Sequence, residues 1–166
     1  MHYEIERKYL IRYPDLALLA AQDGCEVWNI TQTYLTGEPG ETRRVRKVVC
    51  AQGTFYYRTF KRRASALTAE ENESALDLEA YEQYLTERDP ASSVIFKTRY
   101  RIPYEGHTIE VDLYPFWSDR AIMEVELDSE DEAALLPDYI RVIRDVSGEK
   151  AYKNRMLALK VPMETL

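Results

Sequence analysis

Charged residues occupy alternate positions in several segments whose intervening residues are apolar or aromatic. Glu4, Glu6 and Lys8 alternate with Ile5 and Tyr9. The same alternation recurs at Arg44 and Arg46, at Lys97, Arg99 and Arg101, at Glu110 and Asp112, and at Glu124 and Glu126. A period of two is typical of β-strands, on which successive side chains point to opposite faces. At least five strands are therefore expected to carry a stripe of charges on one face.

The sign of each stripe points to a specific chemistry. On a single strand, a solvated face over a buried apolar face would explain a charged stripe. Solvated faces usually mix both signs with neutral polar residues, whereas these stripes are nearly pure in sign. If the sheet closes, basic and acidic stripes can face one lumen. Arginine and lysine there would bind a polyanion through phosphate oxygens, and grouped carboxylates would bind Mg²⁺ or Mn²⁺. The pattern predicts metal-dependent phosphate chemistry.

Short alternating segments rich in Tyr, Val, Ile and Thr dominate the chain and predict the elements that position these charges. Strands are expected near residues 2–11, 28–36, 42–50, 54–63, 69–74, 94–104, 107–115 and 121–128. Gly and Pro residues in the connections predict antiparallel hairpins. Helices are expected at 14–24, 76–85, 129–136 and 149–158. The predicted fold class is mainly β (α+β), an eight-stranded antiparallel barrel that forms a tunnel, with a few peripheral helices.

Bulk composition bounds the class of protein. The 166 residues fit a single domain spanning 1–166, and the net charge of −7 argues against a nucleic-acid groove. The two cysteines and two histidines lack metal-ligand spacing, which argues against a zinc site. No apolar run reaches the roughly 18 residues that cross a bilayer, so we expect no membrane partner and a cytoplasmic location. The charges are nevertheless segregated, because residues 42–63 contain eight basic residues and no acidic one.

The order of the charged segments resembles that of the CYTH, or triphosphate tunnel metalloenzyme, family. EIERK at 4–8 matches the ExExK signature with which this family opens. Further segments follow in the family's order: TQTYL (31–35), RRVRK (43–47), TFKRR (59–63), ENES (71–74), KTRYRIP (97–103), IEVDLY (109–114), MEVEL (123–127) and VSGEKAYKN (146–154). ExExK alone is a weak signal, but the ordered set covers residues 2–158. The segment EIERKYLI at 4–11 resembles the small bacterial tripolyphosphatase branch.

This resemblance implies a barrel whose lumen binds a small triphosphate substrate and a divalent cofactor, Mg²⁺ or Mn²⁺. The implied metal ligands are Glu4, Glu6, Glu124 and Glu126, with Asp112 or Glu110 assisting. The implied phosphate-binding residues are Lys8, Arg44, Arg46, Lys61, Arg63, Lys97, Arg99 and Lys150. The implied catalytic residues are Glu4 and Glu6 with Glu71 and Glu73, the last two orienting water or a basic neighbour.

The expected activity is metal-dependent hydrolysis of inorganic tripolyphosphate, or of a small triphosphate compound, to diphosphate and phosphate. The family also includes thiamine triphosphatases and class IV adenylate cyclases, which convert ATP to cyclic AMP and pyrophosphate. Because all of these share a triphosphate and a metal, the stripes do not choose among them. A non-catalytic polyphosphate-binding module is the alternative from another class. The intact set of carboxylates favours an enzyme.

Overall fold

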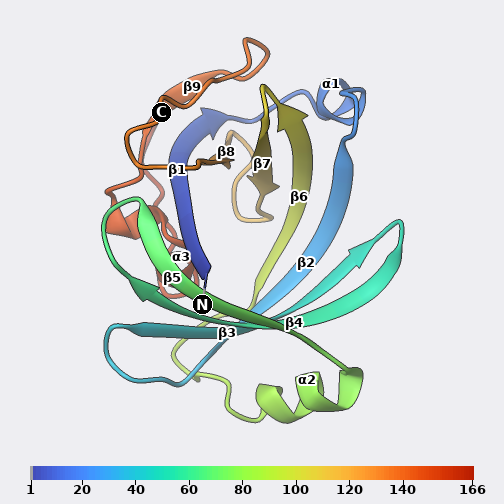
Figure 1. The fold of residues 1–166 in the computed structure, drawn as a ribbon, viewed down its shortest axis with the longest axis vertical. Coiled ribbons are helices and arrows are strands. Elements are labelled where there is room, and N and C mark those ends of the chain that lie inside the picture. The colour runs from blue at the N-terminus through green and yellow to red at the C-terminus, as the bar shows by residue number, and fades with distance from the viewer. Residues whose placement is uncertain (1) are drawn as a thin grey trace.

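The computed structural model describes residues 2–166 and shows a β-barrel with short helices around it (Figure 1). In chain order the elements are β1 (His2–Arg12), α1 (Leu16–Ala20), β2 (Glu26–Leu35), β3 (Glu41–Cys50), β4 (Gly53–Arg63), β5 (Thr68–Leu76), α2 (Leu78–Leu85), β6 (Ile95–Tyr104), β7 (His107–Leu113), β8 (Arg120–Glu126), β9 (Val142–Asp145), the 3-10 helix η1 (Lys150–Tyr152) and α3 (Asn154–Leu157). No helix within residues 2–166 is long and apolar enough to cross a membrane.

Eight of the strands close into an antiparallel ring. Neighbouring strands follow the order β5-β4-β3-β2-β6-β7-β8-β1, and a further pairing of β5 with β1 completes the ring. Strand β1 achieves this by dividing its length, because residues 2–5 pair with β5 and residues 6–12 pair with β8. The ninth strand, β9, pairs with residues 9–11 of β1 outside the ring. The predicted eight-stranded antiparallel barrel is confirmed.

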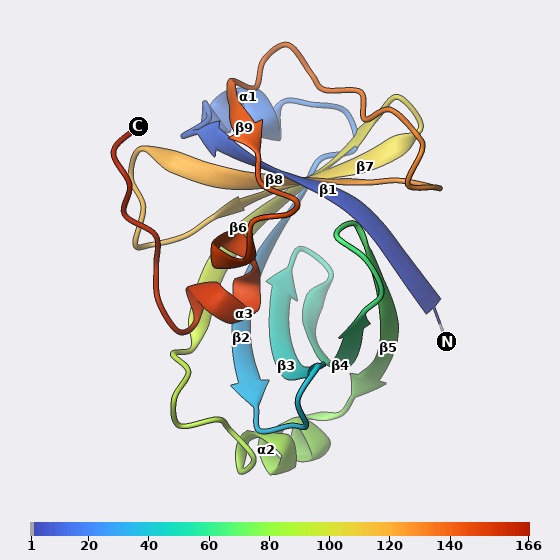
Figure 2. The same cartoon turned by 90° about the vertical axis from the view of Figure 1, so that its left-hand side faces the viewer.

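Alternation along the strands separates a charged lumen from an apolar exterior. On β7 and β8 the residues between the acidic positions are fully buried, among them Ile109, Val111 and Met123. They form one apolar cluster with Leu19 of α1. On the other side of the barrel, α2 lies beneath β3 and β4 in both views, and its Tyr81 packs on Val45 and Leu35 (Figures 1 and 2). The hydrophobic core therefore surrounds the barrel and leaves the inner face to charged side chains.

At one end of the barrel the inward-facing positions become apolar. Leu10 follows Lys8 at the same parity of β1, and Ile122 precedes Glu124 at the same parity of β8. Leu10 and Ile122 are buried in a second cluster with Trp117 and residues of η1 and α3. Figure 2 shows α3 and the C-terminal segment on the side of the barrel turned toward the viewer. This cluster fills one end of the lumen and limits how far the charged stripes extend.

The helix predicted at 129–136 is wrong. Turns and irregular backbone occupy that segment. Its acidic and apolar side chains form tertiary contacts instead, because Glu132 meets His107 at the start of β7 and Leu136 packs on the outer apolar cluster. Such contacts override a weak helical preference. The other three predicted helices are present but shorter, and β9 was not predicted.

Candidate active site in the barrel lumen

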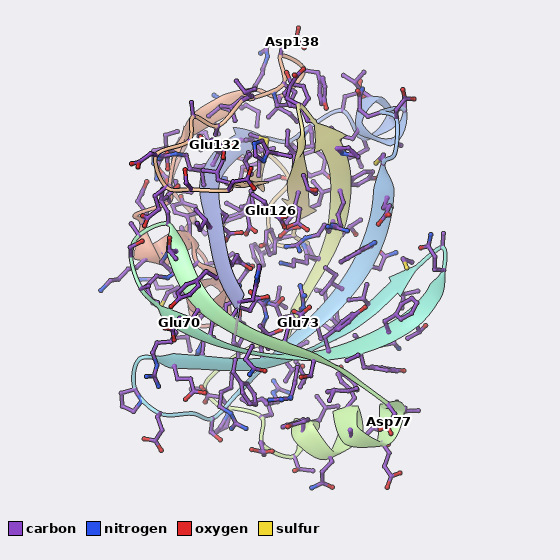
Figure 3. All side chains as sticks on the ribbon, viewed as in Figure 1. Glu70, Glu73, Asp77, Glu126, Glu132 and Asp138 are labelled. Carbon is purple, nitrogen blue, oxygen red and sulfur yellow. The ribbon has the colours of Figure 1, made fainter. Side chains whose placement is uncertain are left out.

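The lumen contains a cavity of about 640 Å³ whose walls are mostly charged. Every site residue predicted from the sequence lines it except Lys97 and Asp112. The lining residues from the prediction are Glu4, Glu6, Lys8, Arg44, Arg46, Lys61, Arg63, Glu71, Glu73, Arg99, Glu110, Glu124, Glu126 and Lys150. Figure 3 labels Glu73 and Glu126, which enter this cavity from β5 and β8. The closed ring thus brings together residues that lie up to about 146 positions apart in the chain, from Glu4 to Lys150.

The acidic wall is formed by carboxylates that face one another across strand pairs. Glu6 lies directly opposite Glu126, and Glu110 lies directly opposite Glu124. Like charges in such positions repel. Burial and the charges of Glu124 and Glu4 raise the pKa of Glu6 well above its usual range. Burial and the charge of Glu110 raise the pKa of Glu126 to about 7. A divalent cation would offset this repulsion, and carboxylate oxygens are the ligands that Mg²⁺ and Mn²⁺ prefer.

The basic wall has buried hydrogen-bond donors that no other group in the described part of the chain pairs with. Arg44 and Arg46 are 8% and 6% exposed, and the Nε atom of each is buried with no hydrogen-bond partner among residues 2–166. Buried polar atoms are normally paired, so these guanidinium groups are poised for a ligand that enters the lumen. Burial, together with the charges of Arg44 and Arg99, lowers the pKa of Arg46 to about 10. Glu73 is its acidic neighbour, with 3.3 Å between Oε2 and Arg46 Nη2. A polyanion in the lumen would relieve this crowding of cations.

Lys61 of β4 joins two carboxylates where β1 and β5 close the barrel. Its Nζ atom lies 3.0 Å from Glu4 Oε1 and 3.3 Å from Glu71 Oε2. Burial opposes ionisation of Glu4, but the charges of Lys61 and Arg44 and the hydrogen bonds with Glu71 and Lys61 together outweigh it and hold the pKa of Glu4 far below its usual range. Burial and a hydrogen bond with Glu4 raise the pKa of Glu71 to about 7. Glu71 and Glu73 thus each lie beside a basic residue, Lys61 and Arg46 respectively.

Lys97 and Asp112 lie one layer behind the cavity wall. Both side chains are 0% exposed, and Lys97 Nζ donates to Asp112 Oδ2 at 2.9 Å. Arg99, which does line the cavity, donates from Nε to Asp112 Oδ1 at 2.8 Å and from Nη2 to Asp112 Oδ2 at 2.9 Å. Both oxygens of Asp112 are therefore engaged by cations. Burial lowers the pKa of Lys97 to about 7 even though Asp112 opposes the shift.

The C-terminal segment contributes cavity residues that the sequence reasoning missed. Lys153 and Arg155 line the cavity together with Lys150. Burial and the charges of Arg63 and Lys8 lower the pKa of Lys153 to about 8. The segment VSGEKAYKN contains Lys153, so the motif that marked Lys150 also contained the signal for this second lysine.

Arg101 and Tyr34 complete the cavity wall. Arg101 lines the cavity and donates from Nε to Glu110 Oε2 at 3.0 Å, while its guanidinium lies 4.4 Å from the ring centre of Trp28. Tyr34 is 1% exposed and accepts a hydrogen bond of 2.8 Å from Gln32 Nε2. The ring of Trp28 and the hydroxyl of Tyr34 therefore border the charged walls. Arg101 and Tyr34 were not among the predicted catalytic residues.

Comparison with known proteins places this lumen in a family. An inorganic triphosphatase from Nitrosomonas europaea is 32% identical over 165 residues, which is 96% of this chain and 99% of the relative. The crystal structure of an inorganic triphosphatase aligns with a TM-score of 0.60 at 29% identity and covers 98% of this chain and 99% of its own. A Hippeastrum protein described as having a dominant triphosphatase activity shares the fold, with a TM-score of 0.53, 15% identity and coverage of 76% and 80%.

No family model matches the sequence. The identity to the Nitrosomonas protein spans nearly the full length of both chains, and the structural alignment with the inorganic triphosphatase likewise covers nearly all of each. The chain belongs to the CYTH, or triphosphate tunnel metalloenzyme, family.

Proposed function

We propose that this protein hydrolyses inorganic tripolyphosphate, or a small triphosphate compound, to diphosphate and phosphate inside the barrel, with Mg²⁺ or Mn²⁺ as cofactor. The observation that carries this proposal is the opposition of two walls in one cavity. Paired carboxylates from β1 and β8 face arginines of β3 whose buried Nε atoms have no hydrogen-bond partner among residues 2–166. The similarity to an inorganic triphosphatase supports the same reaction.

Binding of the triphosphate is the task of the basic wall. Arg44 and Arg46 present guanidinium groups that match phosphate oxygens in pairs, and Lys8 adds a point charge from β1. Lys8 Nζ lies 3.4 Å from Glu124 Oε1, so this lysine stands where the two walls meet. Hydrogen bonds from these groups hold the phosphoryl oxygens and stabilise the charge that develops on the departing diphosphate.

The acidic wall supplies the metal ligands and the position of the attacking water. Glu4, Glu6, Glu124 and Glu126 would hold the cation, which when bound offsets phosphate charge and activates water. A carboxylate of this wall accepts a hydrogen bond from the attacking water and orients it in line with the departing diphosphate. Glu71, with a pKa raised to about 7, stands beside Glu4 and can exchange a proton near neutral pH.

A phosphate-release assay tests the proposal. Purified protein with Mg²⁺ or Mn²⁺ is offered tripolyphosphate, thiamine triphosphate, ATP and a longer polyphosphate, and phosphate, diphosphate and cyclic AMP are measured. We expect equal amounts of phosphate and diphosphate from tripolyphosphate. Cyclic AMP from ATP would refute the hydrolase in favour of a cyclase. Triphosphate binding without turnover of any substrate with either metal would identify a binding module.

A further inference from the structure

The lumen has a buried second layer of charge behind Arg99. Strands β6 and β7 pair so that Arg99 lies directly opposite Asp112, and Arg101 directly opposite Glu110. Asp112 accepts two hydrogen bonds from Arg99, one from Nε at 2.8 Å and one from Nη2 at 2.9 Å. This geometry fixes the plane of the guanidinium and leaves Nη1 directed to Glu110 at 3.0 Å. Lys97 reaches the same carboxylate of Asp112 from the far side.

The charge balance of this cluster depends on Lys97. Arg99 donates hydrogen bonds to two carboxylates, those of Asp112 and Glu110, and Arg101 shares the second of them. A third carboxylate, Glu124, lies 4.0 Å from Arg99 and is offset by Lys8 at 3.4 Å. Without Lys97 the two acids would cancel both guanidinium charges, and the cluster would offer no net attraction to a polyanion. Below pH 7 Lys97 is mostly protonated, and in that form it offsets the charge of Asp112 and returns one net positive charge to the cluster. Arg99 lines the cavity and Lys97 does not. Lys97 therefore affects a ligand by leaving the positive charge of Arg99 uncancelled.

We propose that Lys97 and Asp112 are positioning residues for Arg99, with Asp112 fixing the guanidinium and Lys97 offsetting the charge of Asp112. Neither side chain touches the substrate or the metal, because both are 0% exposed, Lys97 Nζ donates to Asp112, and both oxygens of Asp112 accept from Lys97 or Arg99. This inference rests on the proposed triphosphate site. It gives Lys97 and Asp112 roles that differ from the phosphate-binding and metal-binding roles implied by the family resemblance.

A double-mutant cycle separates a positioning role from direct contact. Lys97→Met and Arg99→Gln are made singly and together, and the dissociation constant for tripolyphosphate is measured by calorimetry without metal at fixed ionic strength. Each single variant leaves Asp112 with one cationic partner, but the double variant leaves it with none. The comparison in the Arg99→Gln background is therefore made with Asp112→Asn present in both members, and all measurements are made at pH 6, where Lys97 is charged. We expect Lys97→Met to weaken binding about tenfold in the wild-type background and by less than about twofold in the Arg99→Gln background.

A control variant on β3 accompanies the double-mutant cycle, and two outcomes would overturn the inference. Lys47→Met makes the same chemical change on β3 at a residue outside the lumen and should leave the dissociation constant unchanged. Circular dichroism and thermal unfolding verify the fold of each variant. Equal losses from Lys97→Met in both backgrounds would show that Lys97 contacts the phosphates itself and would overturn the inference. Failure of the wild-type protein to bind tripolyphosphate would instead overturn the proposed function, and this inference with it.

A metal-binding measurement tests Asp112 separately. Mn²⁺ affinity is measured by electron paramagnetic resonance in the absence of triphosphate for Asp112→Asn and for Glu124→Gln. We expect Asp112→Asn to stay within about twofold of the wild-type affinity, because its oxygens face Arg99 and Lys97, whereas Glu124→Gln loses about tenfold or more. A comparable loss in Asp112→Asn would identify Asp112 as a metal ligand and overturn its positioning role.

Discussion

Replacing Glu126 by Gln should stabilise the metal-free protein at pH 8 and have much less effect at pH 4.5. The folded protein holds the pKa of Glu126 at about 7, against an ordinary value of 4.5, through burial and the charge of Glu110. Between these two values the unfolded chain releases its proton first, so the stability present below pH 4.5 is lost as the pH rises toward 7. Glutamine carries no charge and does not lose this stability.

The magnitude follows from the size of the shift. Each pKa unit corresponds to about 1.4 kcal/mol, so a shift from 4.5 to about 7 would cost at most roughly 3.4 kcal/mol. Glu126 is only partly buried, and solvent screening reduces this to about 1–2 kcal/mol. Urea unfolding in the presence of a chelator, at pH 4.5 and pH 8, measures the difference between variant and wild type at each pH.

The matched control is Glu82→Gln, which makes the same change at an exposed position of α2. It should shift the free energy of unfolding by the same small amount at both pH values. A second arm adds Mg²⁺ or Mn²⁺ at pH 8, which should stabilise the wild type through binding to the folded state and stabilise Glu126→Gln less. An equal effect of Glu126→Gln at both pH values, or destabilisation at pH 8, would refute the electrostatic account of the acidic wall.

Three further substitutions address the other parts of the site. Glu4→Gln and Glu6→Gln should abolish metal-dependent phosphate release while circular dichroism shows an intact fold, and near-full rates would remove both residues from the metal site. Lys8→Ala should weaken tripolyphosphate binding about tenfold through loss of one charge-assisted contact, and an unchanged dissociation constant would place Lys8 outside the phosphate path. Arg46→Met removes a cation whose pKa is lowered to about 10 by burial and by Arg44 and Arg99. This substitution should raise the melting temperature of the ligand-free protein and weaken tripolyphosphate binding about tenfold. A lower melting temperature would contradict the idea that repulsion among these cations destabilises the empty barrel.

Side-chain parity predicted which face of each strand is charged but not the depth of each charge in the barrel. Lys97, Arg99 and Arg101 share one parity of β6 and are equivalent in a sequence pattern. In the structure Lys97 is 0% exposed, while Arg101 is 28% exposed at the cavity. The difference arises from where the apolar cluster around Leu10 and Ile122 fills the lumen. A two-residue period contains no information on that boundary.

Local signals failed where tertiary contacts decide the structure. The acidic run at 129–136 has the composition of a helix N-terminus, yet its residues contact β7 and the outer core instead. Strand β9 has four residues and exists through pairing with β1, which a segment of that length does not reveal by itself. Lys153 lies beside helical residues and reaches the lumen because the C-terminal segment packs against the barrel.

The lumen explains how an acidic protein can bind a polyanion. Opposed carboxylates and crowded arginines both destabilise the ligand-free barrel. The apolar side chains on the outer face of the strands offset this cost, because Val111, Met123 and their neighbours are fully buried. The net charge of −7 is spread over the whole chain, whereas the arginines of β3 act at contact distance on whatever enters the cavity. Charges farther away than about 8–10 Å are largely screened by physiological salt. We expect the local sign at the basic wall to govern recognition, and the proposed binding of triphosphate with a divalent cation would neutralise both walls together.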